Sequence, residues 1–283
     1  MIFTKEELRI FITEQNRIFD IVRLVDVSMT RQYTIDNNGE FIEAPYECYN
    51  VWNKKKRCDC CISSKVLLSK KQFTKFEFIG DDIYFVIALY VEVEGNEYSV
   101  ELVAKFTDET LFAAYGKEEF ARTIQSYNNK IYKDSLTNAY NRRYFEEQLK
   151  QLRGINAIVV LDLDDFKKIN DTYGHIAGDE VLKEVVKVCD NNIRSVDVIV
   201  RWGGDEFVLL FLEIPEKIVQ NKLEIIRKSI NDIYFDKYQN LKILVSMGCV
   251  VTEHATNFFE EADQALYEGK KKGNSIVIRK VDS

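Results

Sequence analysis

The stretch VIVRWGGDEFVLLFL, Val198–Leu212, constrains the fold of this chain more than any other segment. Two apolar runs, VIVRW and FVLLFL, are rich in the β-branched and aromatic residues that favour buried strands, and only four residues separate them. This spacing predicts a β-hairpin whose tip carries Asp205 and Glu206 beside Gly203 and Gly204. An Asn-Gly pair would close such a turn without placing two carboxylates next to a core. The acidic tip therefore points to chemistry.

The composition indicates a soluble globular protein. The chain has 283 residues, 46% hydrophobic and 30% charged, which suffices for two domains of ordinary size. Its net charge of -7 argues against a nucleic-acid partner held mainly by charge. No apolar run approaches the roughly 18 residues that cross a bilayer, and the N-terminal stretch lacks a signal peptide's apolar core. We expect a cytoplasmic protein without membrane insertion, whose cysteines stay reduced.

The C-terminal part, residues 134–283, alternates strand and helix patterns. Buried strands are predicted at 157–164, 198–202, 207–212 and 241–251. One face of an amphipathic helix carries Val181, Leu182, Val185, Val186, Cys189 and Ile193, and further helices are predicted at 217–233 and 258–272. Cys189 and Cys249 occupy apolar periodic positions, so we assign both to the core. The result is an α/β (α+β) domain with helices against a mostly antiparallel sheet.

The N-terminal part, residues 1–107, predicts one helix followed by short strands. The strands are Ile21–Asp26, Arg31–Asp36, Phe73–Ile79, Ile83–Val93 and Glu97–Phe106, with a turn at Gly95-Asn96 between the last two. A small antiparallel sheet with helical connections is expected. The order of these elements, ending in AKFTDET before a helix, resembles PAS sensory domains.

A helical pattern over residues 108–133 joins the two parts. Phe120, Ile124, Tyr127 and Ile131 recur at spacings of 4, 3 and 4, as in a short coiled coil. Two interpretations fit: an amphipathic helix packed on its own domain, or a connecting helix that pairs with a second copy of the chain. We favour the second.

A second acidic cluster follows the strand VVLDL. Asp162, Asp164 and Asp165 lie where this buried strand meets its loop, and adjacent strands could bring Asp162 to the hairpin tip. Mg²⁺ prefers such carboxylates together with phosphate oxygens. A carboxylate cluster of this kind could also clamp two metal ions about 4 Å apart. One of Asp164 and Asp165 is instead expected to cap the next helix.

Five segments in register resemble one known family. DSLTNAYNRR, DLDDFKKINDTYGHIAGDEVL, RWGGDEF, SMGCV and ADQALYEGKKKGNS are similar in order and spacing to the GGDEF domain of diguanylate cyclases. The resemblance covers nearly all of the last 150 residues or so. It implies a fold like the nucleotidyl cyclase and polymerase palm, and the joining of two GTP into cyclic di-GMP with release of two pyrophosphates.

The resemblance also assigns roles. The catalytic residues would be Asp162, Asp205 and Glu206, and the metal ligands these three with the carbonyl of Leu163, holding Mg²⁺ or Mn²⁺, two per half-site. Substrate would be bound by Asn170, Asp179, Phe166, Lys167, Gly203, Gly204 and Lys270. Asn170 and Asp179 match the guanine-reading pair, and one carboxylate can accept from both guanine N1–H and its 2-amino group. Phe166 and Lys167 would lie in a loop around the phosphates. His175 would be a structural hydrogen-bonder.

The chain departs from the family pattern after Lys270. The family usually has Gly-Arg-Asn where this chain has Gly273-Asn274-Ser275, so a phosphate-binding arginine is missing at Asn274. Lysines at 271 and 272 cannot reproduce the bidentate fork of arginine. Gly269 replaces a common alanine and should loosen its helix by up to about 1 kcal/mol.

Arg194 and Asp197 match the family's RxxD motif for inhibition by the product, cyclic di-GMP. The motif alone is weak and is often a surface ion pair, but its distance from the hairpin is the expected one. A second arginine is absent where Ile225 stands, with Arg227 nearby, so we expect weaker inhibition.

Four cysteines, Cys48, Cys58, Cys60 and Cys61, cluster in the N-terminal part. They could hold zinc or an iron–sulfur cluster, form a thiol redox switch, or be ordinary reduced thiols. The adjoining Lys54–Arg57 run should lower the thiol pKa values and favour the thiolate.

The leading hypothesis is a homodimeric diguanylate cyclase with three parts: a PAS-like sensor (1–107), a connecting helix (108–133) and a GGDEF domain (134–283). The alternative is a catalytically weak or silent receptor that binds GTP or cyclic di-GMP and signals through protein partners. The complete set of carboxylates favours the enzyme.

Overall fold

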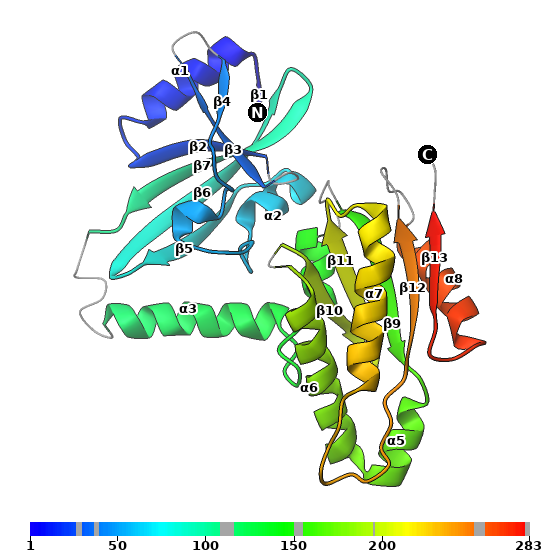
Figure 1. The fold of residues 1–283 in the computed structure, drawn as a ribbon. Coiled ribbons are helices and arrows are strands. Elements are labelled where there is room, and N and C mark those ends of the chain that lie inside the picture. Colours follow the sequence, from blue (N-terminus) through cyan, green and yellow to red (C-terminus); the bar gives the residue numbers. More distant parts are fainter. Residues whose placement is uncertain are drawn as a thin grey trace. The chain divides into compact units, whose positions relative to one another are not determined.

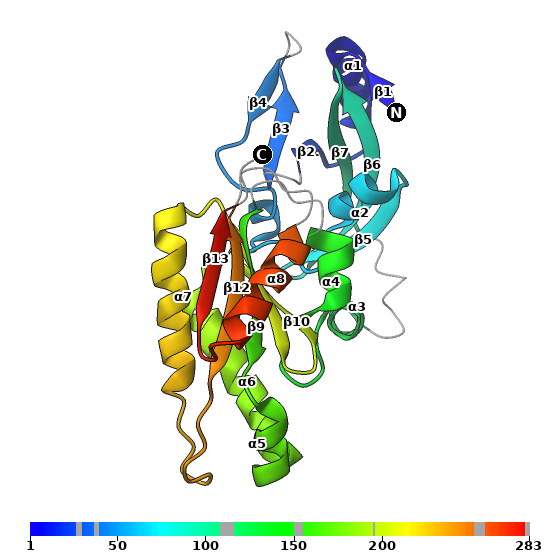
Figure 2. The same ribbon diagram turned by 90° about the vertical axis from the view of Figure 1, so that its right-hand side faces the viewer.

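The computed structural model describes residues 1–26, 30–36, 40–107, 116–149, 155–194, 196–251 and 258–280. The chain forms two compact units, which are described separately. One comprises residues 1–131 and 146–153, and the other residues 132–145 and 154–283. Each is built on a single sheet (Figures 1 and 2). Within the described residues, no helix is long and apolar enough to cross a membrane.

The first unit contains a seven-stranded sheet with the order β1-β6-β7-β2-β3-β4, in which β5 also pairs with β6. Its strands are β1 (Ile2–Phe3), β2 (Ile21–Asp26), β3 (Arg31–Ile35), β4 (Phe41–Glu43), β5 (Phe73–Ile79), β6 (Asp82–Val93) and β7 (Asn96–Lys105). All pairs are antiparallel except β1 with β6. The five predicted strands are confirmed, while β1 and β4 are too short to show a pattern.

The helical elements of this unit are α1 (Lys5–Gln15), the short turn η1 (Asn50–Trp52), α2 (Ile62–Ser69) and α3 (Lys117–Tyr132). α1 begins at a capping box in which Thr4 and Glu7 bond each other's backbone N–H groups. The β6–β7 hairpin turns at Glu94 and Gly95, both with positive φ, one residue earlier than predicted.

Helix α3 packs at its N-terminal end on its own unit. The Phe120 ring lies 5.0 Å from Phe76 and 6.2 Å from Phe78, centroid to centroid. Tyr127, from the predicted coiled-coil seam, is 60% exposed. Packing on the chain's own domain is thus seen for Phe120, and pairing with a second copy stays a prediction. The predicted helix start at residues 108–115 lies outside the described residues.

The second unit contains a six-stranded sheet with the order β13-β12-β9-β11-β10-β8. Its strands are β8 (Tyr140–Asn141), β9 (Ile155–Leu163), β10 (Val198–Gly203), β11 (Glu206–Leu212), β12 (Val245–Val251) and β13 (Ile276–Lys280). The inner pairings are antiparallel, but β8 and β13 add in parallel at the two edges. The sheet is therefore mixed. The expectation of a mostly antiparallel sheet holds only for its centre, because no sequence pattern predicted the two edge strands.

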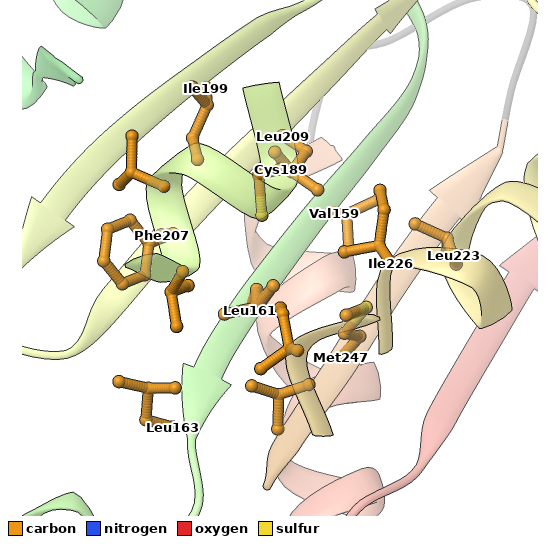
Figure 3. Packing of buried hydrophobic residues seen from close by; sticks show 14 of the residues in the cluster. Val159, Leu161, Leu163, Cys189, Ile199, Phe207, Leu209, Leu223, Ile226 and Met247 are labelled. Atoms are coloured by element: carbon orange, nitrogen blue, oxygen red, sulfur yellow. The ribbon is translucent and has the colours of Figure 1, made fainter. Parts of the chain in front are cut away.

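The helices of this unit are α4 (Arg142–Tyr144), α5 (Phe166–Tyr173), α6 (His175–Asn192), α7 (Glu216–Asn231) and α8 (Phe258–Lys270). α4, α6, α7 and α8 pack on the sheet, and α5 packs on α6. The π-helical turn η3 (Phe145–Leu149) follows α4 and belongs to the first unit from Glu146 on. Figure 3 shows Cys189 of α6 and Ile226 of α7 packed with Val159 and Leu161 of β9. Cys189 and Cys249 are fully buried, which confirms that both belong to the core. This packing fixes the central strands whose ends carry the acidic residues.

Candidate active site

The β10–β11 hairpin has a two-residue tip. Gly203 pairs with Glu206, which leaves Gly204 and Asp205 as the loop, and Gly204 adopts a φ of +52°. A Cβ atom added at Gly203 or Gly204 would meet no other atom within 4 Å. The face of the tip is therefore open, and a ligand could approach the backbone closely.

Strand β9 brings Asp162 to this tip. Glu206 lies directly opposite Asp162 in the antiparallel register of β9 and β11, and the Leu163 N–H faces the Asp205 carbonyl at 3.4 Å. The sequence placed these carboxylates on separate strands, and the sheet brings them to one edge.

Lys270 partly neutralises this acidic edge. The Lys270 ammonium, at the end of α8, donates to Asp162 Oδ2 at 2.6 Å. Burial raises the pKa of Asp162 to about 6; Lys270 acts in the opposite direction, and Asp205 and Glu206 add to the rise. Burial works to lower the pKa of Lys270, but Asp162 and its acidic neighbours outweigh it, so this pKa is raised.

The donor set suits a hard divalent cation in its chemistry. Among the described residues no group of three or more His, Cys, Asp or Glu side chains is close enough to hold a metal ion. Asp162, Asp205 and Glu206 nevertheless all act electrostatically on Lys270, so within the described residues of this edge three carboxylates stand against one ammonium group. Carboxylate oxygens and the Leu163 carbonyl are the ligands that Mg²⁺ prefers. These residues fit a magnesium ion by charge and donor type.

Asp164 has a structural role that the sequence did not reveal. Its carboxylate accepts from Ser246 Oγ at 2.7 Å and from the Asn274 N–H at 2.6 Å, which ties the end of β9 to the turn after α8. Asp165 occupies the N-cap position of α5 with a φ of +55°, and its side chain makes no capping bond. The prediction that one of these two side chains caps the helix is wrong.

Asn274 is held by its neighbours. Its φ is +45°, a conformation that asparagine tolerates better than most residues. Its side chain hydrogen-bonds with Asn231 at 3.1 Å, and its carbonyl accepts from Arg227 Nη1 at 3.3 Å. Gly269 accepts a hydrogen bond from Ser275 Oγ at 2.8 Å, and an alanine Cβ there would lie 3.1 Å from that oxygen.

Helices α5 and α6 bring Asn170 and Asp179 to the same corner. A Cβ at Gly178 would lie 2.0 Å from Asn170 Oδ1 and 3.1 Å from Phe166 Cζ, so only glycine permits this approach. Asp179 follows on the exposed side of α6. Sequence reasoning missed Gly178, although it stands directly before Asp179.

Two details of this corner differ from expectation. Phe166 and Lys167 form the first turn of α5, which corrects their assignment to a loop. His175 is exposed at the first position of α6, and the described residues provide it with no hydrogen bond, so its structural bond is not found.

Arg194 and Asp197 bond each other. Arg194 donates to both carboxylate oxygens of Asp197, at 3.1 and 2.7 Å, and also to the carbonyl of Leu212. The Asp197 side chain is only 1% exposed, and its Oδ1 also accepts from the Leu212 N–H at 3.3 Å. Arg227 pairs with Glu224 at 2.6 Å and is therefore engaged elsewhere.

Arg201 ties the tip of the hairpin to Asp134. Its guanidinium donates to the Gly204 carbonyl at 3.0 and 2.7 Å and to Asp134 Oδ1 at 2.8 Å. Burial alone would raise the pKa of Asp134, but Thr137 and Arg201 outweigh it, so this pKa is lowered. Arg201 and Asp134 are the first residues of the segments RWGGDEF and DSLTN. Both segments were recognised in the sequence, but neither residue was assigned a role.

The N-terminal cysteines differ from the prediction. Cys48, Cys58 and Cys61 are at most 7% exposed and lie in the hydrophobic core with Trp52. Burial raises the pKa values of Cys48, Cys58 and Cys60, and the nearby lysines and arginines only partly oppose it. The predicted lowering of thiol pKa values is therefore wrong. The described residues include no metal-binding group here, so zinc or an iron–sulfur cluster has no support.

Comparison with known proteins gives one consistent family. Residues 131–275 match the family described as diguanylate cyclase, GGDEF domain. The probable diguanylate cyclase DgcT of Escherichia coli is 34% identical over 197 residues, which is 65% of this chain and 42% of that protein. Diguanylate cyclase A of Treponema denticola is 39% identical over 127 residues, 43% of this chain and 34% of that protein. The chain thus spans less than half the length of either relative.

A solved structure has the same fold. The coiled coil and GGDEF domain of DgcB from Caulobacter crescentus, in complex with c-di-GMP, is 28% identical, with a TM-score of 0.52. The similarity covers 57% of this chain and 93% of that one. With the family match over half its length and the acidic hairpin in place, the chain belongs to the GGDEF diguanylate cyclase family.

Proposed function

We propose that this protein condenses two GTP molecules into cyclic di-GMP and releases two pyrophosphates. In each half-reaction the 3′-oxygen of one GTP attacks the α-phosphorus of the other. The new P–O bond forms as the bond to the β-phosphate oxygen breaks, and the 3′-hydroxyl loses its proton. The observation that carries the proposal is the pairing of Asp162 with Glu206 in register, beside Asp205 at an open tip.

The residues around the tip would bind different parts of GTP. Asn170 and Asp179 would read guanine, because Asp179 is exposed and can accept from its two adjacent donors. Gly203 and Gly204 leave room for the nucleotide. Lys270 would move from Asp162 to a triphosphate oxygen when GTP binds. Phe166 and Lys167, in the first turn of α5, would wrap the phosphates.

The acidic residues would hold the magnesium ions. Asp162, the Leu163 carbonyl and Asp205, with help from Glu206, are the proposed ligands for two Mg²⁺ or Mn²⁺ ions. When bound, such ions lower the pKa of a coordinated hydroxyl and neutralise phosphate charge. Glu206 would assist the loss of the 3′-hydroxyl proton.

Two chains would be required for one product. Each subunit holds one GTP, so two half-sites must face each other, and we propose a homodimer. The N-terminal unit, for which the sequence suggests a PAS-like sensor, would regulate that pairing through α3. Arg194 and Asp197 would bind cyclic di-GMP as an inhibitory site after giving up their present mutual contacts.

A second candidate is a weak or silent receptor for GTP or cyclic di-GMP. The observation in its favour is Asn274, which replaces a phosphate-binding arginine and is fixed by Asn231 and Arg227. Lower affinity for nucleotide would follow.

Incubation with GTP and Mg²⁺ over a range of protein concentrations separates the two. If the protein is a cyclase, cyclic di-GMP and pyrophosphate should form, and the rate per subunit should rise with protein concentration as dimers form. Saturable GTP binding without cyclic product at any concentration would refute the cyclase and support the receptor.

A further inference from the structure

The first unit contains a pocket unrelated to the acidic edge. Its volume is about 800 Å³, within the range of small-molecule sites. Three segments line it: the loop after η1, strand β5, and one side of α3 with Ile124, Gln125, Asn128 and Asn129. Figure 1 shows α3 running alongside β5.

The pocket is basic in an acidic chain. Five cationic side chains line it against two carboxylates, although the whole chain has a net charge of -7. The cations are Lys54, Lys55, Lys56, Arg57 and Lys75, and the acids are Asp59 and Glu77.

Two of the cations share one counter-ion. Lys54 and Lys75 contact the two oxygens of Glu77, at 2.6 and 2.5 Å respectively. Lys75 is only 9% exposed at its side chain and also lies 5.5 Å from the Trp52 ring centroid. Glu101 also acts on Lys75 but is paired with Arg23, so Glu77 between its two ammonium groups leaves one positive charge in the wall.

The other lining groups are apolar or neutral. Residues alternate across β5, so Lys75 and Glu77 lie on one face and Phe76 and Phe78 on the other. Among the described strands β5 pairs only with β6, and residues of both its faces line the pocket, so one ligand would reach both faces around the unpaired edge of β5. The Phe76 ring is held 5.0 Å from Phe120 of α3. Gln125, Asn128 and Asn129 add amide groups from α3.

We propose that this pocket binds a small organic anion with a flat apolar body. Its carboxylate or phosphate group would lie by Lys55, which makes no ion pair within the described part of the chain, and by the surplus charge of Lys54 and Lys75. Its body would lie on Phe76 and Phe78. Aromatic walls beside fixed cations discriminate against both simple salts and uncharged apolar molecules.

Fluorescence titration of the full chain with 8-anilinonaphthalene-1-sulfonate tests this without GTP, so the outcome is separate from the cyclase activity. This probe combines a flat apolar body with one negative charge. The uncharged N-phenyl-1-naphthylamine is the matched probe. We expect one saturable site for the anion, weakened by salt, and at least about tenfold weaker binding of the neutral probe.

Two pairs of variants locate the site. Lys55→Glu should raise the dissociation constant of the anion about tenfold, whereas Lys71→Glu makes the same charge change at an exposed residue outside the pocket and should not. Asn128→Trp should fill the pocket and abolish binding, whereas Ser126→Trp, on an exposed part of α3, should preserve it. Binding unchanged by Lys55→Glu and Asn128→Trp would show that the anion binds elsewhere and would overturn the proposal. Equal affinity for the neutral probe would overturn it as well.

Discussion

Arg201 and Asp134 are joined by an ion pair of 2.8 Å, and the same guanidinium holds the carbonyl of Gly204 at the tip of the acidic hairpin. Arg201 is therefore placed to set the position of Gly204 and, through it, of the adjacent Asp205. A planar fork can satisfy two acceptors at once, which an ammonium group cannot do in the same geometry.

We expect Arg201→Lys to lower kcat for cyclic di-GMP formation about tenfold, because a slightly displaced tip misaligns the reacting groups. The thermal midpoint should change little, since the pair is partly solvated. Arg279→Lys, which alters ion pairs with Glu261 and Glu268 on α8, is the matched control and should retain the wild-type rate. Wild-type turnover in Arg201→Lys would show that the fork does not position the tip.

Gly178→Ala should weaken GTP binding. The new Cβ would fall 2.0 Å from Asn170 Oδ1, so α5 must shift away from α6 and separate Asn170 from Asp179. We expect at least about a tenfold rise in the dissociation constant for GTP, measured by calorimetry. Lys183→Ala, at an exposed position of the same helix, is the control. The same affinity for GTP in Gly178→Ala as in Lys183→Ala would show that the close approach at Gly178 is not needed for guanine recognition.

Gly248→Ala should lower the denaturant concentration at which the second unit unfolds. Its Cβ would lie 2.1 Å from the Leu266 backbone N and 2.2 Å from the Ala262 carbonyl O, atoms that cannot give way without moving α8. Overpacking of this kind costs about 1–3 kcal/mol or more. Gly203→Ala, where a Cβ meets nothing within 4 Å, should leave stability within about 0.5 kcal/mol of wild type. Chemical denaturation followed by circular dichroism distinguishes the two, and equal midpoints would contradict the packing argument.

The pH dependence of stability should report on Glu101. Burial alone would raise the pKa of Glu101, but Arg23 and Lys75 outweigh it, so its folded pKa is lowered. A lowered carboxyl pKa contributes stability above the unfolded value of about 4.3 and loses it as the pH falls through the folded value.

Glu101→Gln should destabilise the first unit by about 3–5 kcal/mol at pH 7, because it leaves Arg23 buried without its 2.5 Å partner. The difference from wild type should shrink as the pH falls below about 4. Urea unfolding at several pH values measures it. A constant difference across that range would show that the ionisation of Glu101 does not contribute.

Apolar runs predicted the centre of each sheet well. The strands of Val198–Leu212 and the strand that ends at Asp162 were predicted from the length of their apolar runs and their β-branched and aromatic content. Because adjacent strands of a sheet can bring their ends together, the meeting of Asp162 with the hairpin tip could also be anticipated. The edge strands β8 and β13 could not, because two to five partly exposed residues carry no periodic signal.

What the sequence could not supply were contacts between distant segments. The bond from Asn274 to Asp164 spans 110 positions, whereas the sequence suggested for Asp164 only that it or Asp165 caps the next helix. The need for glycine at 178 depends on how closely α5 and α6 approach, which no local pattern encodes. The cysteine pKa values were misjudged for the same reason: the neighbouring charges were visible in the sequence, but the depth of burial was not.

The central claim is that the acidic hairpin and Asp162 catalyse formation of cyclic di-GMP. The most direct test is the initial rate of cyclic di-GMP formation from GTP and Mg²⁺ by the wild-type chain, Asp205→Asn and the control Asp232→Asn. Asp232 is an exposed residue at the end of α7, so its variant makes the same chemical change away from the site. We predict product from the wild type, the same rate from Asp232→Asn, and a loss of at least about 100-fold in Asp205→Asn. No product from the wild type, or an undiminished rate in Asp205→Asn, would contradict the claim.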